Sequence, residues 1–329
     1  MMSTTFKSLF VLALPLLASA HGIVTKVTIA GKVFNGNTPN QNSPSIIRKS
    51  SSPDPNKPAS SPALTCGPNA GPAALVADAN PGDELQFFWT GADKSNWPHN
   101  TGPMLTYLAN CGDVTCDKFD TSNAKWFKID QVGRKSQGSA DWVQADLMTG
   151  SPATVSLPSN LAPGNYLIRH EIIALHLATS FQGAEFYPAC AQLKVGGSGT
   201  GAPKQSELVS FPGGYSDNDK GIFDPDVFTP SVAYVFPGPQ IASFVSGSSS
   251  APAPSSGSSP SSSKAPSASS TKGASSPSAT SASSNSGAPK SCKLKKSSSK
   301  SASAAATSAT MRPRHVSRVM RGLAFGQSH

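Results

Sequence analysis

Residues 84–89, Glu-Leu-Gln-Phe-Phe-Trp, carry the clearest strand pattern in the chain. Their first four side chains alternate polar and apolar, and a period of two is typical of a strand with one buried face. The residues directly ahead, Pro81-Gly82-Asp83, are turn formers. The stretch therefore predicts a half-buried β-strand that begins at a turn.

Similar short runs recur along the chain, separated every ten residues or so by Gly, Pro, Asn and Ser. No long stretch keeps a helical period. This pattern predicts an all-β fold over residues 21–245, an antiparallel immunoglobulin-like β-sandwich with long loops. Residues 35–65 have no aromatic side chain and are expected to form a long surface loop. The expected strands are Ile23–Ile29, Glu84–Trp89, Thr154–Leu157, Tyr166–Leu175 and Ala191–Val195.

The first twenty residues have the features of a secretory signal peptide. Lys7 precedes an apolar run from Leu9 to Leu17, and Ala18-Ser19-Ala20 supplies a small-x-small cleavage pattern. Cleavage after Ala20 would make the protein a secreted, extracellular one with His21 as its first residue. No later apolar run is long enough to be a transmembrane segment.

Residues 246–329 form a tail rich in Ser, Ala, Pro and Lys, which is expected to be disordered. The tail holds eleven Lys and Arg and no Asp or Glu, which leaves sixteen against eighteen in the rest of the chain. The net charge of +9 therefore belongs to the tail, and the composition gives no support for binding to nucleic acid. One hypothesis is that the tail anchors the protein to anionic wall polymers.

Five cysteines are present, and an oxidising compartment favours disulfides among them. Cys66, Cys111, Cys116 and Cys190 lie in the predicted sandwich and allow three pairings. Cys111 and Cys116 are close enough to close a local loop. The fifth, Cys292, is left over in the tail. No C-x-x-C pair occurs, so metal binding by cysteine is not indicated.

Histidines supply the candidate metal ligands. An N-terminal histidine offers two nitrogens, its α-amine and its ring, and a second histidine held opposite would complete a three-nitrogen clamp that suits copper. His99 lies in a loop of turn residues, Trp97–Met104. His170 and His176 flank a predicted strand and would share one face if no bulge intervenes; either could be structural or chemical.

Several motifs, read in order, identify a known family. The chain resembles the fungal lytic polysaccharide monooxygenases of auxiliary activity family 9, formerly glycoside hydrolase family 61. The likeness covers essentially the whole predicted sandwich. It is carried by His21-Gly22, Pro81-Gly82-Asp83, His99-Asn100-Thr101-Gly102-Pro103, Tyr107–Cys111, Trp126–Asp130, Leu161–His176, Phe186–Cys190 and Pro212–Tyr215.

The resemblance implies the roles of individual residues. One copper ion per chain would be held by His21, through its amine and ring, and by His99. Tyr187 would be the axial ligand, with its hydroxyl near the metal, and His176 would hydrogen-bond the oxygen species. The family's disulfides would be Cys66–Cys190 and Cys111–Cys116.

One catalytic position departs from the family. Gln usually stands two residues before the axial Tyr, whereas this chain has Glu185. Gln can donate a hydrogen bond to oxygen, but an ionised Glu can only accept one. We expect Glu185 to change the protons available near the metal.

The implied activity is oxidative cleavage of crystalline or amorphous cellulose, or a related β-glucan, by hydrogen abstraction at the glycosidic carbon. The co-substrates would be O2 or H2O2 and electrons from a reductant or an electron-donating redox enzyme, and the protein would be a monomer. Because such a substrate is flat, the site should lie on a flat surface, where Tyr215 is the candidate for stacking on a sugar.

Two other classes of protein fit these residues less well. No pair of carboxylates indicates a glycosidase. A secreted copper-binding protein without polysaccharide-oxidising activity is the alternative, and the retention of Tyr187 and His176 favours the enzyme.

Overall fold

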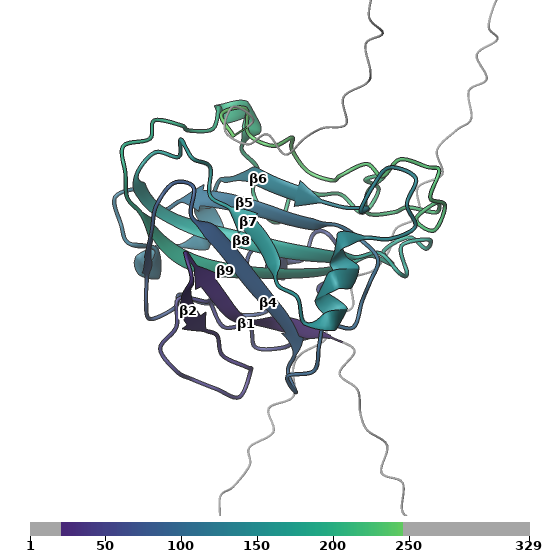
Figure 1. Cartoon of the computed structure of the whole chain (residues 1–329), viewed down its shortest axis with the longest axis horizontal. Helices are drawn as coiled ribbons and strands as arrows, with labels where there is room; N and C mark the ends of the chain where they lie inside the picture. The colour runs from purple at the N-terminus through teal and green to yellow at the C-terminus, as the bar shows by residue number, and fades with distance from the viewer. Residues whose placement is uncertain (1–20, 246–329) are drawn as a thin grey trace, which may run out of the picture. The chain divides into compact units, whose positions relative to one another are not determined.

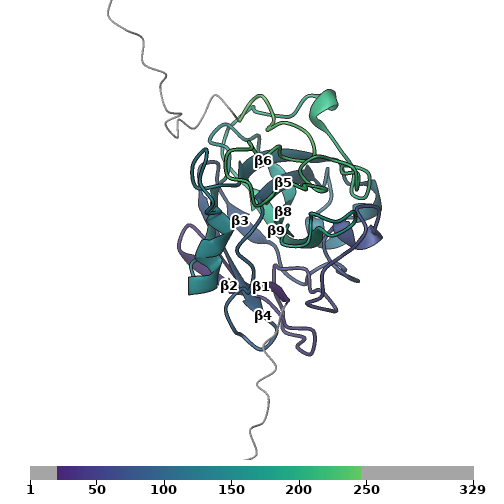
Figure 2. The same ribbon diagram turned by 90° about the vertical axis from the view of Figure 1, so that its right-hand side faces the viewer.

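Two β-sheets face each other in the computed structural model, which describes residues 21–245 (Figure 1). The four-stranded sheet has the order β2-β1-β4-β7 and the five-stranded sheet the order β3-β9-β8-β5-β6. Figure 2 shows β1, β2 and β4 on one side of the sandwich and β5, β6, β8 and β9 on the other. All strand pairs are antiparallel except β3 with β9, which is parallel.

The strands span β1 Gly22–Ile29, β2 Lys32–Asn35, β3 Ala77–Ala79, β4 Glu84–Gly91, β5 Met104–Asn110, β6 Trp126–Val132, β7 Ala153–Ser156, β8 Gly164–Ala174 and β9 Glu185–Val195. Short 3-10 helices lie at Pro62–Leu64, Cys116–Lys118, Thr121–Asn123, Val143–Thr149 and Gln205–Glu207. No helix of residues 21–245 is long and apolar enough to cross a membrane.

The predicted all-β sandwich is confirmed, and each of the five expected strands is found, as β1, β4, β7, β8 and β9. The strands β2, β3, β5 and β6 were not predicted. In β5 the first six residues are all buried, so no polar alternation marks the strand in the sequence. The predicted signal peptide and tail lie outside the described residues.

The alternation in β4 places its apolar side chains between the sheets. Leu85, Phe87 and Trp89 are at most 3% exposed, and the residues between them are more exposed. Phe87 is opposite Val27 of β1, which is fully buried. Side chains of both sheets therefore share one core.

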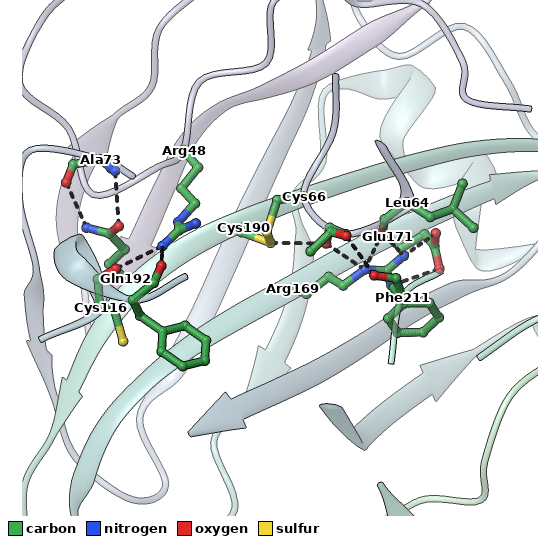
Figure 3. Close-up of a disulfide and its surroundings, with 12 residues drawn as sticks. Arg48, Leu64, Cys66, Ala73, Cys116, Arg169, Glu171, Cys190, Gln192 and Phe211 are labelled. Carbon is green, nitrogen blue, oxygen red and sulfur yellow. Dashed lines mark hydrogen bonds and ion pairs between the residues drawn. A yellow bond between two sulfur atoms is a disulfide. The ribbon is translucent and has the colours of Figure 1, made fainter. Parts of the chain in front are cut away.

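A second core lies on the outer face of the five-stranded sheet, where loops cover it. The guanidinium of Arg169 in β8 donates to the carbonyl of Leu64, and the Gln192 side chain exchanges hydrogen bonds with the backbone of Ala73 (Figure 3). Arg169 also pairs with Glu171 on the same strand, with both side chains fully buried. The segment between β2 and β3 therefore packs against the sheet.

Both disulfides agree with the pairing that the family resemblance implies. Cys66 is joined to Cys190 of β9, and Cys111 is joined to Cys116 (Figure 3 shows the first). The first bridge ties the segment between β2 and β3 to the five-stranded sheet.

Candidate metal centre

His21 lies directly before β1, at one end of the sandwich. Gly22 pairs with Gly91, the last residue of β4, so His21 lies beside the connection that follows β4. This connection carries His99. Pairing of β1 with β4 therefore brings together two histidines that are 78 positions apart in the sequence.

The loop around His99 is fixed to the end of β8. The amide of Leu175 donates to the carbonyl of Thr101, and the amide of Ile173 donates to that of Pro103. Gly102 has a φ of +128°, and a Cβ there would lie 2.0 Å from the carbonyl oxygen of Ile173. Only glycine allows this approach, which holds His99 next to the end of β8.

The connection between β8 and β9 carries His176 and leads into Glu185, the first residue of β9. Ala174 and Glu185 are the last pair of these strands before the loop of residues 175–184. At Gly183, a Cβ would lie 1.7 Å from the carbonyl oxygen of Leu177. The lack of a side chain there lets the loop fold back, so that His176 and Glu185 lie together.

The predicted copper ligands gather around the ring of Tyr187. Its centroid lies 6.4 Å from that of His21 and 6.0 Å from that of His99. The Tyr187 hydroxyl lies 3.4 Å from Nε2 of His99. Trp97 supports both side chains edge-on, with centroids 4.9 Å from Tyr187 and 5.3 Å from His99.

Glu185 and Tyr187 form a hydrogen-bonded pair beneath the histidines. The Tyr187 hydroxyl donates to Oε2 of Glu185 at 2.8 Å. Burial alone would raise the pKa of Glu185, but the Tyr187 hydrogen bond and the charge of Lys57 outweigh it and lower that pKa. Burial and the Glu185 carboxylate both raise the pKa of Tyr187. Glu185 is therefore an ionised acceptor and Tyr187 a protonated donor.

His176 lies flat against His99, with ring centroids 4.4 Å apart and planes 14° from parallel. Its Nε2 faces Oε2 of Glu185 at 3.9 Å, and its Nδ1 is buried without a hydrogen-bond partner in the described part of the chain. The Glu185 carboxylate attracts an N–H group at Nε2 of His176, whereas Nδ1 of this ring has no acceptor in the described part of the chain. A neutral His176 therefore carries its proton at Nε2, directed at the site.

Two charged residues of the site were not predicted from the sequence. Asp54 places Oδ1 3.2 Å from Nδ1 of His21, and Lys57 places Nζ 3.2 Å from Oε1 of Glu185. Both belong to the stretch of residues 35–65, which has no aromatic side chain. That stretch holds four charged residues, Arg48, Lys49, Asp54 and Lys57, and these charges were the signal that could have found them.

Two residues considered for the site, Tyr215 and His170, are buried in the cores of the fold. The predicted stacking role of Tyr215 is wrong, because this residue is 7% exposed and its hydroxyl donates to Oε2 of Glu171 at 2.7 Å. A ring held in the second core cannot lie on a sugar face. His170 points into the core between the sheets and is 3% exposed, whereas His176 lies beyond the last residue of β8. The expected common face for these histidines therefore does not exist.

The side chains of the site fit copper by their donor chemistry. Imidazole nitrogens suit this metal, and His21 and His99 supply them beside the Tyr187 ring. Ligand atoms of His99, His176 and Glu185 also lie within 4.8 Å of one another, which is a second arrangement able to hold a metal ion. His99 is common to both sets.

The chain matches known proteins over the β-sandwich. The family model described as Auxiliary Activity family 9 (formerly GH61) matches residues 21–234. An AA9 family lytic polysaccharide monooxygenase from Gloeophyllum trabeum is 53% identical over 233 residues, which is 70% of this chain and 67% of that relative.

Two solved structures share the fold. The structure of a cellulose-active polysaccharide monooxygenase from M. thermophila aligns with a TM-score of 0.60 at 35% identity, over 67% of this chain and 98% of that one. The extended catalytic domain of a lytic polysaccharide monooxygenase from H. jecorina aligns with a TM-score of 0.63 at 31% identity, over 70% of this chain and 94% of that one. Sequence and fold agree, and the chain belongs to auxiliary activity family 9, a family of lytic polysaccharide monooxygenases.

Proposed function

We propose that this protein is a secreted, copper-dependent enzyme that oxidatively cleaves β-1,4-glucan chains, with cellulose as its substrate. The observation that carries the proposal is the placement of both His21 and His99 beside the Tyr187 ring, with Nε2 of His99 3.4 Å from the Tyr187 hydroxyl. Family membership supports the oxidative chemistry. The cellulose-active relative from M. thermophila supports the choice of substrate.

The residues that would hold copper are His21, His99 and Tyr187. His21 would bind through its ring and through the α-amine that removal of residues 1–20 frees. His99 would bind through a ring nitrogen, and the Tyr187 hydroxyl, 3.4 Å from its Nε2, would complete the set of ligands. Bound copper would supply one-electron chemistry with O2 or H2O2, using electrons from an external donor.

The surrounding side chains would control protons and orientation. Tyr187 stays protonated and its hydroxyl donates to Glu185. This hydrogen bond holds the Glu185 carboxylate at the site. His176 presents an N–H from its Nε2 atom. Trp97 packs against His99 and Tyr187 and excludes water from beneath them. The side chains around the metal would thus combine one hydrogen-bond acceptor, the Glu185 carboxylate, with two donors, the Tyr187 hydroxyl and the N–H group of His176.

The exposed surface beside His176 is our candidate for contact with the polysaccharide. Leu177 and Phe181, in the connection from β8 to β9, are 49% and 54% exposed. Phe181 follows His176 by five residues, so at most about 18 Å of chain separates their Cα atoms. An aromatic ring held at a surface can stack on a sugar, the role first expected of Tyr215.

The proposal is tested with protein whose first residue is His21. Copper titration should show one tight site, and incubation with cellulose, a reductant and O2 should release oxidised oligosaccharides. A matched protein with one extra glycine before His21 loses the free histidine amine and should lose both properties. Release of oxidised products that does not depend on copper or on the free amine would contradict the proposal.

The cluster of His99, His176 and Glu185 supports a second candidate, a secreted copper-binding protein without polysaccharide-oxidising activity. Two variants separate the candidates. If His21 is a ligand, His21→Ala abolishes tight copper binding and His176→Ala retains it. If the cluster holds the metal, the results are reversed, and cellulose treated with the copper-loaded protein yields no oxidised products.

A further inference from the structure

Glu185 is held at both of its carboxylate oxygens. Oε1 lies 3.2 Å from Nζ of Lys57, and Oε2 accepts the hydrogen bond from Tyr187 at 2.8 Å. The Glu185 side chain is 9% exposed, whereas that of Lys57 is 32% exposed. Lys57 therefore connects a buried negative charge to the surface.

The backbone on either side of Lys57 is fixed in place. Asn56 and Phe186 exchange two backbone hydrogen bonds, of 2.9 and 3.2 Å, and the Asn56 side chain adds a third, to the Phe186 carbonyl. Two residues after Lys57, the Ala59 amide donates to Oδ1 of Asp217 at 2.7 Å. The backbone at Lys57 is thus anchored against the start of β9, unlike that of a lysine on a mobile surface, whose ion pairs contribute little.

The geometry also shows what competes for the carboxylate. Oε2 of Glu185 lies 3.7 Å from Nε2 of His99 and 3.9 Å from Nε2 of His176. A buried carboxylate that loses its counter-ion is strongly destabilised, which favours a shift toward another cation within reach. Without Lys57, the groups left within reach of the carboxylate are the Tyr187 hydroxyl and the two imidazoles, which alone can become cationic, and His99 must keep a nitrogen for the metal.

We propose that Lys57 is a positioning residue of the metal centre: its ammonium group holds Glu185 on the Tyr187 hydroxyl and away from His99. This inference rests on the proposed function for its consequence at copper, but the placement of Glu185 itself can be tested without metal. Lys57 acts through Glu185 and need not touch copper or substrate.

The first test uses copper-free protein beginning at His21. In Lys57→Met, crystallography should show the Glu185 carboxylate turned from Tyr187 toward His99 and His176. The melting temperature should fall by about 2–4 °C, because an uncompensated carboxylate remains buried. Lys57→Met combined with Glu185→Gln should recover most of that loss, because the amide needs no counter-ion. An unmoved carboxylate in Lys57→Met would overturn the proposal.

The second test uses copper-loaded protein and the electron paramagnetic resonance spectrum of Cu(II). Lys57→Met should change this spectrum in the native background and leave it unchanged in the Glu185→Gln background, and Lys57→Arg should restore it. Lys49→Met is the matched control, because Nζ of Lys49 bonds to the carbonyl of Gln41 and to Asn42 in the same loop. Equal spectral changes in both backgrounds would mean that Lys57 acts only by its charge, and would refute the positioning role.

The two tests separate this inference from the proposed function. If wild-type protein binds no copper, the proposed function fails, and the crystallographic comparison still decides whether Lys57 positions Glu185. If wild-type protein binds copper and cleaves cellulose while the carboxylate is unmoved in Lys57→Met, only the inference fails.

Discussion

Trp89 and His170 are hydrogen-bonded across the sandwich. The indole Nε1–H of Trp89, in β4, donates to Nδ1 of His170, in β8, at 3.1 Å. Because Nδ1 accepts, the ring is neutral and its proton is on Nε2. This bond joins the two sheets by side chains in a core where apolar contacts otherwise prevail.

Stability should fall with decreasing pH because of His170. Burial, reinforced by the charge of Arg169, lowers the pKa of His170 from 6.5 to about 3. The unfolded chain binds a proton at His170 below pH 6.5 and the folded chain does not, so stability is lost as pH falls from about 6.5 toward 3. The loss approaches about 1.4 kcal/mol per pH unit, or about 5 kcal/mol in all.

Urea unfolding of the copper-free protein between pH 7 and 4 measures this effect. His170→Gln keeps an acceptor for Trp89 and removes the titration, so its free energy of unfolding should depend less steeply on pH. Parallel pH dependences for the variant and the wild type would contradict this assignment.

Asp54 should strengthen copper binding. Its carboxylate lies 3.2 Å from Nδ1 of His21 and favours a cation nearby. Because Asp54 is exposed, solvent screens the effect, and Asp54→Asn should weaken Cu(II) affinity only about twofold to fivefold. Isothermal titration at low and high salt checks this, since the difference between the proteins should shrink as salt rises. Asp113→Asn, in another loop, serves as the control.

The two disulfides should differ in their contributions to stability. Cys66–Cys190 has a sequence separation of 124, and Cys111–Cys116 has a separation of 5. In the chain-entropy account, removal of the longer bridge costs about 4–5 kcal/mol and removal of the shorter one about 2 kcal/mol. Paired Cys→Ser variants measured by urea unfolding test the order. A larger loss from the short loop would show that local packing dominates.

Phe181 should contribute to substrate binding without affecting the metal. Its ring is 54% exposed in the loop that links His176 to Glu185. Phe181→Ala should reduce retention on cellulose about threefold to tenfold, because truncation of a contacting aromatic costs about 1 kcal/mol or more. Copper affinity should stay unchanged. Phe228→Ala removes another exposed ring, outside this loop, and retention should remain at the wild-type level.

The sequence predicted the strands whose two faces meet different environments. In β4, the alternation from Glu84 to Phe87 reports one face in the core and one outside it. It did not predict β5, because loops and the opposite sheet bury both faces and the side chains no longer alternate. Burial by distant segments is a property of the folded chain and leaves no periodic signal.

The candidate site divides in the same way. His21, His99, His176 and Tyr187 were named from ordered motifs, and the tertiary structure brings them together by strand pairing and by two close approaches at glycine. Tyr215 was misassigned, because a glycine-rich loop indicates a surface while its hydroxyl is drawn to buried Glu171.

By itself, the sequence determined the β-sandwich, the family and the histidines that are candidates for the metal centre, because these depend on local periodicity and on motifs in order. Only the tertiary structure decided which charges surround them. Lys57 and Asp54 meet Glu185 and His21 through hydrogen bonds and packing between segments far apart in the chain. Electrostatic interaction depends on distance in space, which the order of residues does not specify.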